Sequence, residues 1–326
     1  MEYIGFGGCF GIQYLKSSFF WKNDMRPISQ KRNRIEEQRH DLSERKGGRK
    51  NLRFENMPRL INVLDLLLKI KFINRKGLRN AANIKVEEVE FVFEDLPIGF
   101  NNTRILLITD IHIDCIDTLA ENITRIASEI DYDFCIFGGD YTLSWGKDYG
   151  DAYSKMEAVA CRLREKSRVF GILGNYDRYS IAEVLDRCGV EMLINENVCL
   201  KKKGDKIYLV GLDDCSSYET DDLELADSQI ANGAFKIMVC HSPALYKEVA
   251  QAGYSLYLAG HTHGGQVCLP GGVVISSGTA APRRMVKGKW RYGRMMGYTS
   301  RGVGTSVVSV RFFCPPEMTI ITLRRG

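Results

Sequence analysis

Most histidines of this sequence stand beside aspartates, an asparagine and glycines, in combinations that suit metal binding. Four of the five histidines lie beyond residue 110. The groups, in chain order, are Asp110-Ile111-His112, Gly138-Gly139-Asp140, Gly174-Asn175, His241 and His261-Thr262-His263. Carboxylate, amide and imidazole ligands without a thiolate suit Mn, Fe or Zn better than they suit a structural zinc site built from cysteines.

The number of these side chains indicates two metal ions. Seven ligands exceed what one tetrahedral ion accepts, but they fit two ions that share a bridging carboxylate. Two ions about 3.5–4 Å apart generate a nucleophilic hydroxide from water and orient a phosphoryl group for in-line displacement. Singly, each group has an ordinary explanation as a turn or a hydrogen-bonded core histidine. Their ordered combination favours a metal centre.

Each group follows a short apolar run of β-strand character. The runs are RILLITD ending at Asp110, FCIFGGD at Asp140, VFGILGN at Asn175, FKIMVCH at His241 and SLYLAGH at His261. Segments of helical periodicity separate the first four, at residues 116–130, 152–166 and 180–188. Residues 84–93 predict an edge strand and residues 198–214 a hairpin. Alternating strands and helices indicate a layered α/β domain, in which groups beyond the strand carboxyl ends meet in one crevice.

Composition indicates a soluble globular protein rather than a disordered or fibrous one. The 326 residues are 44% hydrophobic and 26% charged. The ten cysteines are scattered without a Cys-x-x-Cys pair. This spacing argues against a zinc ribbon or a disulfide framework and favours free thiols in a reducing compartment.

Charge divides the chain into a basic extension, residues 1–83, and a catalytic domain, residues 84–326. Residues 1–84 carry 18 Lys and Arg against 8 Asp and Glu, whereas the rest carries 27 against 32. Within the extension, residues 26–53 hold ten Lys and Arg and almost no large apolar residues. They predict a solvated, mobile tract, in which His40 is solvated as well.

An amphipathic helix is predicted near residues 57–79, at the end of the extension. Polar residues recur there at helical spacing, with leucines and other apolar residues between them. The stretch is too short and too charged to span a bilayer. A basic amphipathic helix can lie on an anionic membrane surface, or it can dock on the body of its own protein. Both interpretations remain open at this point.

Asp-x-His, Gly-Asp, Gly-Asn, His and Gly-His-x-His, in this order, resemble the signature of the calcineurin-like metallophosphoesterases over about residues 100–326. The resemblance implies a four-layer αββα sandwich of α/β class with a dinuclear centre. It also implies two divalent ions per chain, with Mn²⁺ expected first and Fe or Zn as alternatives. By motif, one ion would be held by Asp110, His112 and His263, the other by Asn175, His241 and His261, with Asp140 bridging.

The C-terminal stretch YTSRGVGTSVVSVRFFCPPEMTIITL and the segment GHTHGGQVCLP resemble the bacterial membrane-associated branch of this family. One similar group cleaves UDP-2,3-diacylglucosamine in lipid A synthesis and releases UMP. The resemblance therefore implies a cytoplasmic enzyme at the inner membrane face, with a lipid-linked or nucleotide diphosphate as substrate and no nucleic acid partner. Arg301 would contact phosphate; the alternative for Arg301 and Arg311 is surface charge.

The sequence departs from the family pattern at Tyr176. Members usually carry a histidine at this position, supported by the following acid, whereas this chain has Gly174-Asn175-Tyr176-Asp177. Asn175, Tyr176 and Asp177 are the expected catalytic group. A phenol with an ordinary pKa near 10 donates a hydrogen bond but does not cycle protons near pH 7. We therefore expect hydroxide formation to survive and assistance to the leaving group to be weak.

Two other functions fit the sequence. One is the same chemistry on a soluble nucleotide or phosphodiester, and the other is a non-catalytic scaffold that binds metal. The complete ligand set argues against the scaffold, and the basic amphipathic stretch favours a membrane-associated substrate over a soluble one.

Overall fold

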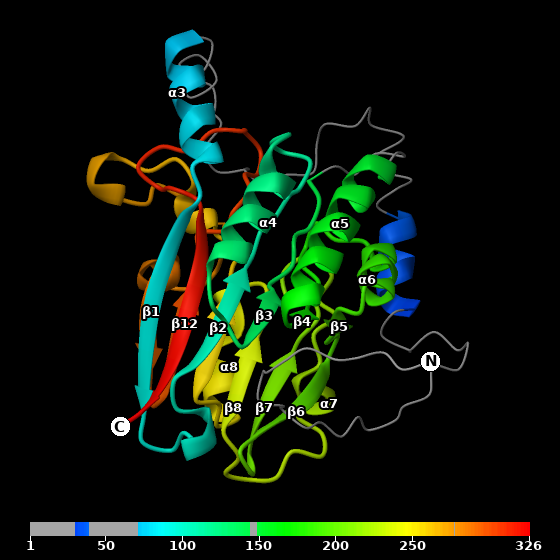
Figure 1. The fold of residues 1–326 in the computed structure, drawn as a ribbon, viewed down its shortest axis with the longest axis vertical. Helices are drawn as coiled ribbons and strands as arrows, with labels where there is room; N and C mark the ends of the chain where they lie inside the picture. Colours follow the sequence, from blue (N-terminus) through cyan, green and yellow to red (C-terminus); the bar gives the residue numbers. More distant parts are fainter. Residues whose placement is uncertain (1–29, 39–70, 144–148, 277) are drawn as a thin grey trace, which may run out of the picture.

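Two stacked six-stranded sheets form the centre of the protein (Figure 1). The computed structural model describes residues 30–38, 71–143, 149–276 and 278–326. The first sheet has the strand order β1-β12-β2-β3-β4-β5. Its strands are β1 (Lys85–Phe93), β12 (Glu317–Arg325), β2 (Thr103–Ile108), β3 (Phe134–Phe137), β4 (Arg168–Gly171) and β5 (Glu191–Met192).

The second sheet has the order β10-β11-β9-β8-β7-β6. Its strands are β10 (Gly288–Tyr292), β11 (Met295–Thr299), β9 (Leu256–Ala259), β8 (Lys236–Val239), β7 (Asp205–Gly211) and β6 (Glu196–Lys202). Strands β6 and β7 form the expected hairpin, and β1 is the expected edge strand, with burial that alternates towards its end. The central strands are buried on both faces, which explains their continuous apolar sequences.

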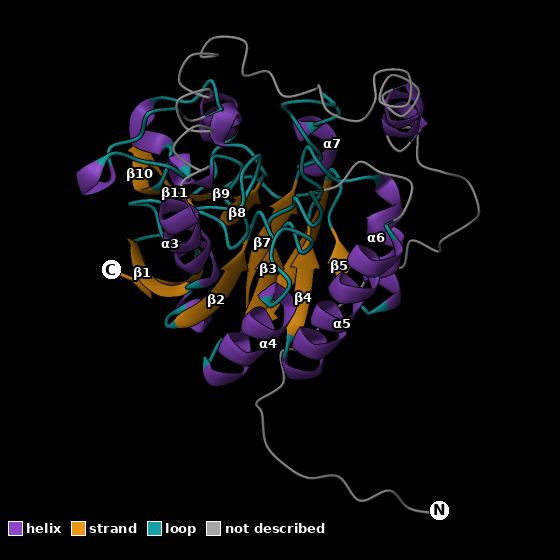
Figure 2. Cartoon of the chain, turned by 90° about the horizontal axis from the view of Figure 1, so that it is seen from above, coloured by secondary structure: helices purple, strands orange, loops and turns teal. Residues whose placement is uncertain are grey.

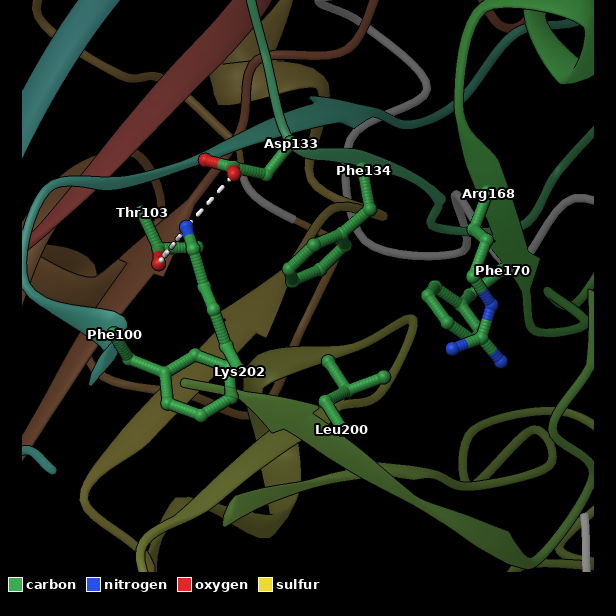
Figure 3. Close-up of a pocket in the computed structure, with 8 residues that line it drawn as sticks. All are labelled: Phe100, Thr103, Asp133, Phe134, Arg168, Phe170, Leu200 and Lys202. Atoms are coloured by element: carbon green, nitrogen blue, oxygen red, sulfur yellow. Dashed lines mark hydrogen bonds and ion pairs between the residues drawn. The ribbon is translucent and has the colours of Figure 1, made fainter. Parts of the chain in front are cut away.

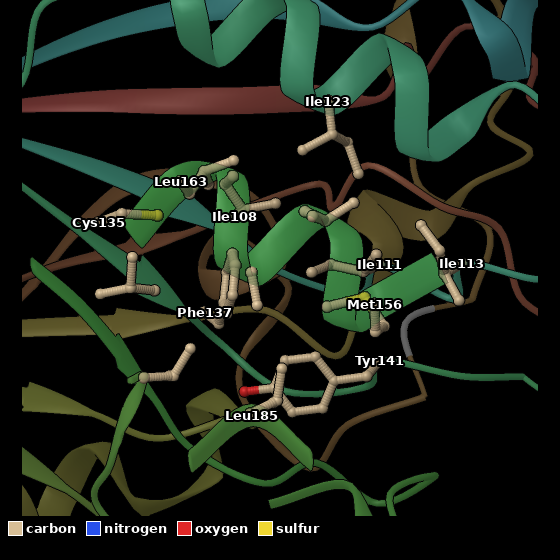
Figure 4. Packing of buried hydrophobic residues seen from close by; sticks show 14 of the residues in the cluster. Ile108, Ile111, Ile113, Ile123, Cys135, Phe137, Tyr141, Met156, Leu163 and Leu185 are labelled. Atoms are coloured by element: carbon tan, nitrogen blue, oxygen red, sulfur yellow. The ribbon is translucent and has the colours of Figure 1, made fainter. Parts of the chain in front are cut away.

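Helices complete a four-layer αββα arrangement and confirm the expected fold class. The predicted helical segments form α4 (Leu119–Glu129), α5 (Gly150–Lys166) and α6 (Tyr179–Arg187). They lie along one face of the first sheet in Figure 2. Figure 4 shows part of the core between these helices and the sheet, with Ile108 and Phe137 from strands and Met156 and Leu185 from helices. A thinner layer with α7 (Leu223–Ala226) and α8 (Tyr246–Gln251) covers the second sheet. Burying an aliphatic or aromatic side chain contributes about 1.5–3 kcal/mol, so these cores hold the strands firmly in place.

Strand register aligns the carboxyl ends that carry the chemical groups. Ile108 at the end of β2 lies opposite Phe137 at the end of β3, and Phe137 lies opposite Gly171 at the end of β4. In the second sheet, Val239 of β8 lies opposite Leu258 of β9. The turns that follow these strands therefore begin at the same edge of the sandwich.

The opposite edge, at the amino ends of β2, β3 and β4, contains a small crevice between the sheets (Figure 3). Lys202 lies there and donates hydrogen bonds to Asp133 Oδ1 at 2.8 Å and to Thr103 Oγ1 at 3.1 Å. Arg168 forms two hydrogen bonds with the carboxylate of Glu191. The charged side chains at this edge thus have protein counter-ions.

The basic extension contains two described helices. Of the stretch expected to be an amphipathic helix, residues 71–79 belong to α3 (Lys71–Ala82), and residues 57–70 lie outside the described residues, as does His40. Helix α3 packs closely against the catalytic domain at Gly77: a Cβ added there would stand 2.7 Å from Val310. Residues 30–38 are also helical. The expectation of a solvated tract is wrong for this segment, because Arg32 is fully buried.

Candidate metal centre

The five strand-end groups meet at the carboxyl edge of the sandwich. The first cluster joins Asp110, His112 and His263, all buried. The Nε2 atoms of His112 and His263 are 3.3 Å apart, and His263 Nε2 lies 3.5 Å from Asp110 Oδ1. The geometry brings together the three residues expected to hold the first ion.

A second cluster shares Asp110 with the first and adds Asp140 and His241. Asp140 Oδ2 lies 3.1 Å from His241 Nε2 and 3.7 Å from His112 Nε2. This carboxylate therefore stands between the two clusters, where a bridging ligand is required. Asp110 Oδ1 is also 3.9 Å from His241 Nε2, so a second carboxylate borders both positions.

Asn175 and His261 adjoin the second cluster. His261 Nδ1 lies 2.7 Å from Asn175 Oδ1, and the His261 ring packs edge-on against the His241 ring with centroids 5.2 Å apart. All seven expected ligands thus lie around two neighbouring positions.

Hydrogen bonds orient the histidine rings for a cation. His241 Nδ1 is 2.7 Å from the carbonyl oxygen of Gly138, and His112 Nδ1 is 3.1 Å from that of Thr142. Because a carbonyl only accepts, both Nδ1 atoms donate to it, and Nε2 is the nitrogen that each ring turns towards the site. His241 Nε2 is buried 3.1 Å from Asp140 Oδ2 and makes no hydrogen bond to any residue that the structure describes. A divalent ion satisfies this nitrogen, so the donor set fits the expected metal pair.

The electrostatics of the site also favour bound cations. Burial would lower the pKa of His241, but Asp140 and then Asp110 outweigh it and raise that pKa well above its usual value. Burial would raise the pKa of Asp140, but His241 and His112 hold it below its usual value. Burial, followed by His112 and Arg311, lowers the pKa of His263 well below its ordinary value. Asp140 is ionised and His263 is neutral, which are the forms that bind metal, whereas His241 must give up a proton when an ion binds.

The backbone is strained where the ligands leave their strands. Five of the seven expected ligands have positive φ, namely Asp110, His112, Asp140, His261 and His263. Non-glycine residues rarely adopt this region, and such outliers concentrate at functional sites. Glycines permit close approach of the carboxylates: an added Cβ would stand 2.3 Å from Asp140 Oδ1 at Gly174 and 2.4 Å from Asp110 Oδ2 at Gly260.

Asp177, expected in the catalytic group, instead supports the site from beneath. Its fully buried carboxylate accepts hydrogen bonds from the backbone N–H groups of Asp140, Tyr141 and Gly174, each at 2.7 Å. Burial and then Asp140 raise the pKa of Asp177 to about 7, while the backbone donors act in the opposite direction. Asp177 is therefore a positioning residue that joins the two ligand-bearing loops.

Tyr176 lies at the side of the metal centre. Its ring packs edge-on against the His112 ring with centroids 5.2 Å apart, and its hydroxyl is 3.4 Å from Ser306 Oγ. Its backbone N–H donates to Asp140 Oδ1 at 2.8 Å. Burial raises the pKa of the Tyr176 phenol, so it stays protonated near pH 7. Its oxygen accepts from the Ser306 hydroxyl, and its O–H can donate.

Both candidate arginines are bound by protein acceptors, and the phosphate contact expected of Arg301 stays a prediction. Arg301 forms ion pairs with Glu317 and with Glu87, the latter at 2.9 Å, so its guanidinium is already engaged by protein carboxylates. Arg311 is fully buried, which excludes surface charge. It donates to the carbonyls of Gly304 at 2.6 Å and His263 at 3.3 Å. Sequence reasoning missed this structural role, although Arg311 is the only charged residue between 302 and 316.

The arrangement suits hydrolysis of a phosphate ester. Two divalent ions bound there would supply a hydroxide near neutral pH and stabilise the charge of the phosphoryl group. The chain itself orients the imidazoles, holds Asp140 ionised, and places the phenol of Tyr176 as a hydrogen-bond donor at the side of the site.

Comparison with known proteins agrees with this chemistry. The family model for calcineurin-like phosphoesterases matches residues 103–265. The uncharacterized metallophosphoesterase YkuE of Bacillus subtilis is 30% identical over 241 residues, which cover 70% of this chain and 82% of YkuE. The phosphodiesterase YaeI of Escherichia coli is 28% identical over 232 residues, 68% of this chain and 82% of YaeI. A transmembrane protein with a metallophosphoesterase domain from Danio rerio is 29% identical over 210 residues, 59% of this chain and 47% of that protein. The chain belongs to the calcineurin-like phosphoesterase family and is a phosphoester hydrolase.

Proposed function

We propose that this hydrolase cleaves a diphosphate or phosphodiester whose carrier lies in an anionic membrane, from the cytoplasmic face. Within this class, UDP-2,3-diacylglucosamine, hydrolysed to release UMP, is the specific candidate. Manganese is the proposed native metal. The observation that carries the proposal is an apolar and basic rim beside the metal centre, formed by exposed Phe72, Leu269, Val273, Val307 and Phe313.

The rim is built from segments that touch one another. Leu269 and Val273 are joined by a hydrogen bond between the Leu269 N–H and the Val273 carbonyl at 3.0 Å. Phe313 lies next to this turn: a Cβ added at Gly272 would stand 3.4 Å from the carbonyl oxygen of Phe313. Gln266 Nε2 donates to the carbonyls of Ser306 and Val308, which hold the turn with Val307 in place. Exposed apolar side chains gathered at one end of a protein typically mark an interaction surface.

Helix α3 adds positive charge to this rim. Arg75, Lys76 and Arg79 are exposed on α3, which also presents Phe72. The Arg311 N–H donates to the Gly77 carbonyl at 3.1 Å, and the guanidinium of Arg311 contacts the loop of the metal ligand His263. A surface bound by α3 would therefore lie close to the ions. Apolar tips combined with lysines and arginines suit an anionic lipid surface. Among the described residues, no helix has the length and apolar character needed to cross a bilayer.

Tyr176 supports a substrate with a good leaving group. An alkoxide must be protonated as it departs, and help from a general acid is typically worth about a hundredfold to ten-thousandfold. A phosphate monoester such as UMP has a second pKa near 6, so it leaves without that help. The always-protonated phenol would position phosphate by donating a hydrogen bond.

The substrate is tested with Mn²⁺-loaded full-length protein and leaving groups of graded pKa. We expect diphosphates and aryl diesters to be cleaved faster than alkyl diesters, and Tyr176→His to help the poorest leaving groups most. Tyr176→Phe is the matched control, since it removes only the hydroxyl. Equal wild-type rates on alkyl and diphosphate substrates would contradict the assignment. A soluble nucleotide cleaved better than UDP-2,3-diacylglucosamine in vesicles would favour the soluble alternative.

The rim is tested by binding to vesicles of phosphatidylglycerol and phosphatidylcholine. Phe72 is 72% exposed and Phe313 is 57% exposed. Replacing either by Ser should weaken binding about tenfold or more, because inserting one aromatic side chain contributes about 1.5–3 kcal/mol. Ile98, 68% exposed near the opposite edge, is the matched control, and Ile98→Ser should bind like wild type. Equal losses in all three variants would argue against this surface.

A further inference from the structure

The helix of residues 30–38 lies against the loop that carries the metal ligand Asn175. It is the blue helix beside α6 in Figure 1. Arg32, in its first turn, is fully buried although the surrounding sequence is strongly basic. A buried arginine must find acceptors for its donors, so its partners define what the segment does.

The guanidinium of Arg32 holds the Asn175 loop on both sides. Nη2 donates to the carbonyl of Gly174 at 2.9 Å and to the carbonyl of Asp177 at 2.7 Å. Between these two carbonyls lie only Asn175, Tyr176 and the remainder of Asp177. Asn175 Oδ1 in turn lies 2.7 Å from His261 Nδ1. One side chain thus restrains the backbone that aims a metal ligand.

The same guanidinium reaches the second sheet. Nη1 pairs with the fully buried carboxylate of Asp213, beyond the end of β7. Asp213 is itself held by the Thr220 hydroxyl at 2.7 Å and by the Asp214 N–H at 2.8 Å. The guanidinium carbon of Arg32 lies over the Tyr218 ring, 3.9 Å from the ring centroid. Arg32 therefore connects a loop of one sheet to a loop of the other, directly behind the second metal position.

Further contacts show that the helix is seated rather than touching at one point. Glu36 Oε1 accepts a hydrogen bond from the Tyr179 N–H at 2.8 Å, at the start of α6. Lys31 Nζ donates to the Glu219 carbonyl at 2.7 Å. Both sites border the loops that Arg32 joins.

We propose that Arg32 is a positioning residue for the ion bound by Asn175, His241 and His261, so that the basic extension completes the metal centre. The planar fork of arginine reaches several acceptors at fixed angles, which a lysine ammonium does not. Without Arg32, Asp213 becomes a buried carboxylate without its cation, and the Asn175 loop loses two hydrogen bonds. The inference depends on the family's metal centre and is independent of the lipid substrate.

The test measures Mn²⁺ binding in full-length protein by calorimetric titration and by metal content after gel filtration. Wild type should bind two ions. In Arg32→Ala, one of the two ions, assigned to Asn175, His241 and His261, should bind about 10–100-fold less tightly, as is typical when groups supporting metal ligands are removed. The other ion should bind as in wild type. The matched control is Arg34→Ala, which removes an exposed arginine of the same helix and should leave both affinities unchanged. With a substrate, kcat should fall more than KM changes.

Arg32→Lys keeps the proposal testable if Arg32→Ala does not fold. It retains a positive charge beside Asp213, so we expect a wild-type circular dichroism spectrum and one weakened ion. Two ions bound with wild-type affinity by folded Arg32→Lys and Arg32→Ala would overturn the proposal. Equal weakening of both ions in folded Arg32→Lys would also overturn it, because that result indicates general destabilisation.

Discussion

The two edges of the sandwich differ in whether their charged side chains are paired with protein groups of opposite charge. At the amino edge, Lys202 has Asp133 as its counter-ion (Figure 3). Arg168 is paired with Glu191. At the carboxyl edge, two buried carboxylates face imidazoles, and His241 Nε2 has no hydrogen-bond partner within the described part of the chain. One edge is electrostatically complete, whereas the other requires cations. The contrast distinguishes a site from a structural ion pair without reference to any motif.

Backbone conformation repeats this contrast. At the carboxyl edge, five expected ligands occupy the left-handed region, at a cost of about 1–3 kcal/mol for each such residue. At the amino edge, positive φ occurs at the turn residues Asn102 and Lys203, which are not candidate ligands. The strain at the carboxyl edge differs because it falls on the predicted metal ligands themselves.

Loss of the bridging carboxylate should have the largest effect. Asp140→Ala removes the ligand that stands between the two positions, and activity should fall by more than about a thousandfold, since metal-ion catalysis is worth several kcal/mol. Metal content and kcat/KM are measured together. Asp131→Ala, which removes an exposed aspartate before β3, is the control and should behave like wild type. An active Asp140→Ala protein containing two ions would refute the bridging role.

The metal-free protein should lose stability as pH rises. The pKa of Asp177 in the folded protein, about 7, lies above its ordinary value of 3.8, so its contribution is complete below pH 4 and disappears as pH passes 7. The raised pKa of His241 acts in the same direction above pH 6.5, whereas the lowered pKa values of His261 and His263 act in the opposite direction below pH 6.5. The loss is therefore expected above pH 6.5, where it should reach about 2 kcal/mol. Urea unfolding in EDTA between pH 6.5 and 8 measures it, and Asp177→Asn should flatten the slope. A stability that increases over this range would contradict the assignment.

Removing one charge at the carboxyl edge should stabilise the metal-free protein. Asp110→Asn relieves repulsion between buried carboxylates while keeping an oxygen to accept the His261 N–H, and we expect a gain of about 1–3 kcal/mol with loss of metal binding. Thermal unfolding in EDTA and Mn²⁺ titration provide the two measurements. A lower unfolding temperature in EDTA would show that Asp110 contributes to stability as an ordinary ion-pair partner.

Removing one charge at the amino edge should lower the stability of the protein, and this change should be the smallest of those predicted. Lys202→Met removes the partner of Asp133 from a pair that is partly exposed, and should cost about 1 kcal/mol of stability. Metal content and kcat/KM should stay at wild-type values. A change in either would mean that the two edges are coupled.

Much of the site was predictable because its information is local. Each ligand directly follows a strand, and a run such as FCIF or LYLA encodes a strand buried on both faces. Parallel strands in register then bring Asp110, Asp140 and Asn175 to one edge. The helices of the first layer and the β6–β7 hairpin follow from the same periodicities, so the expected fold agrees with the structure. Five of the seven predicted ligands lie in the two clusters, and Asn175 and His261 adjoin them.

The supporting residues were decided only by the tertiary structure. Arg32 and Arg311 are buried, Arg301 is bound by two carboxylates, and Asp177 faces backbone N–H groups rather than the substrate side. The acceptors of Arg32 lie 142 and 181 residues away along the chain. Hydrophobic periodicity reports which face of a local element is buried. The environment of a charged side chain depends on partners that only the folded chain brings within hydrogen-bond distance, and no local pattern contains them.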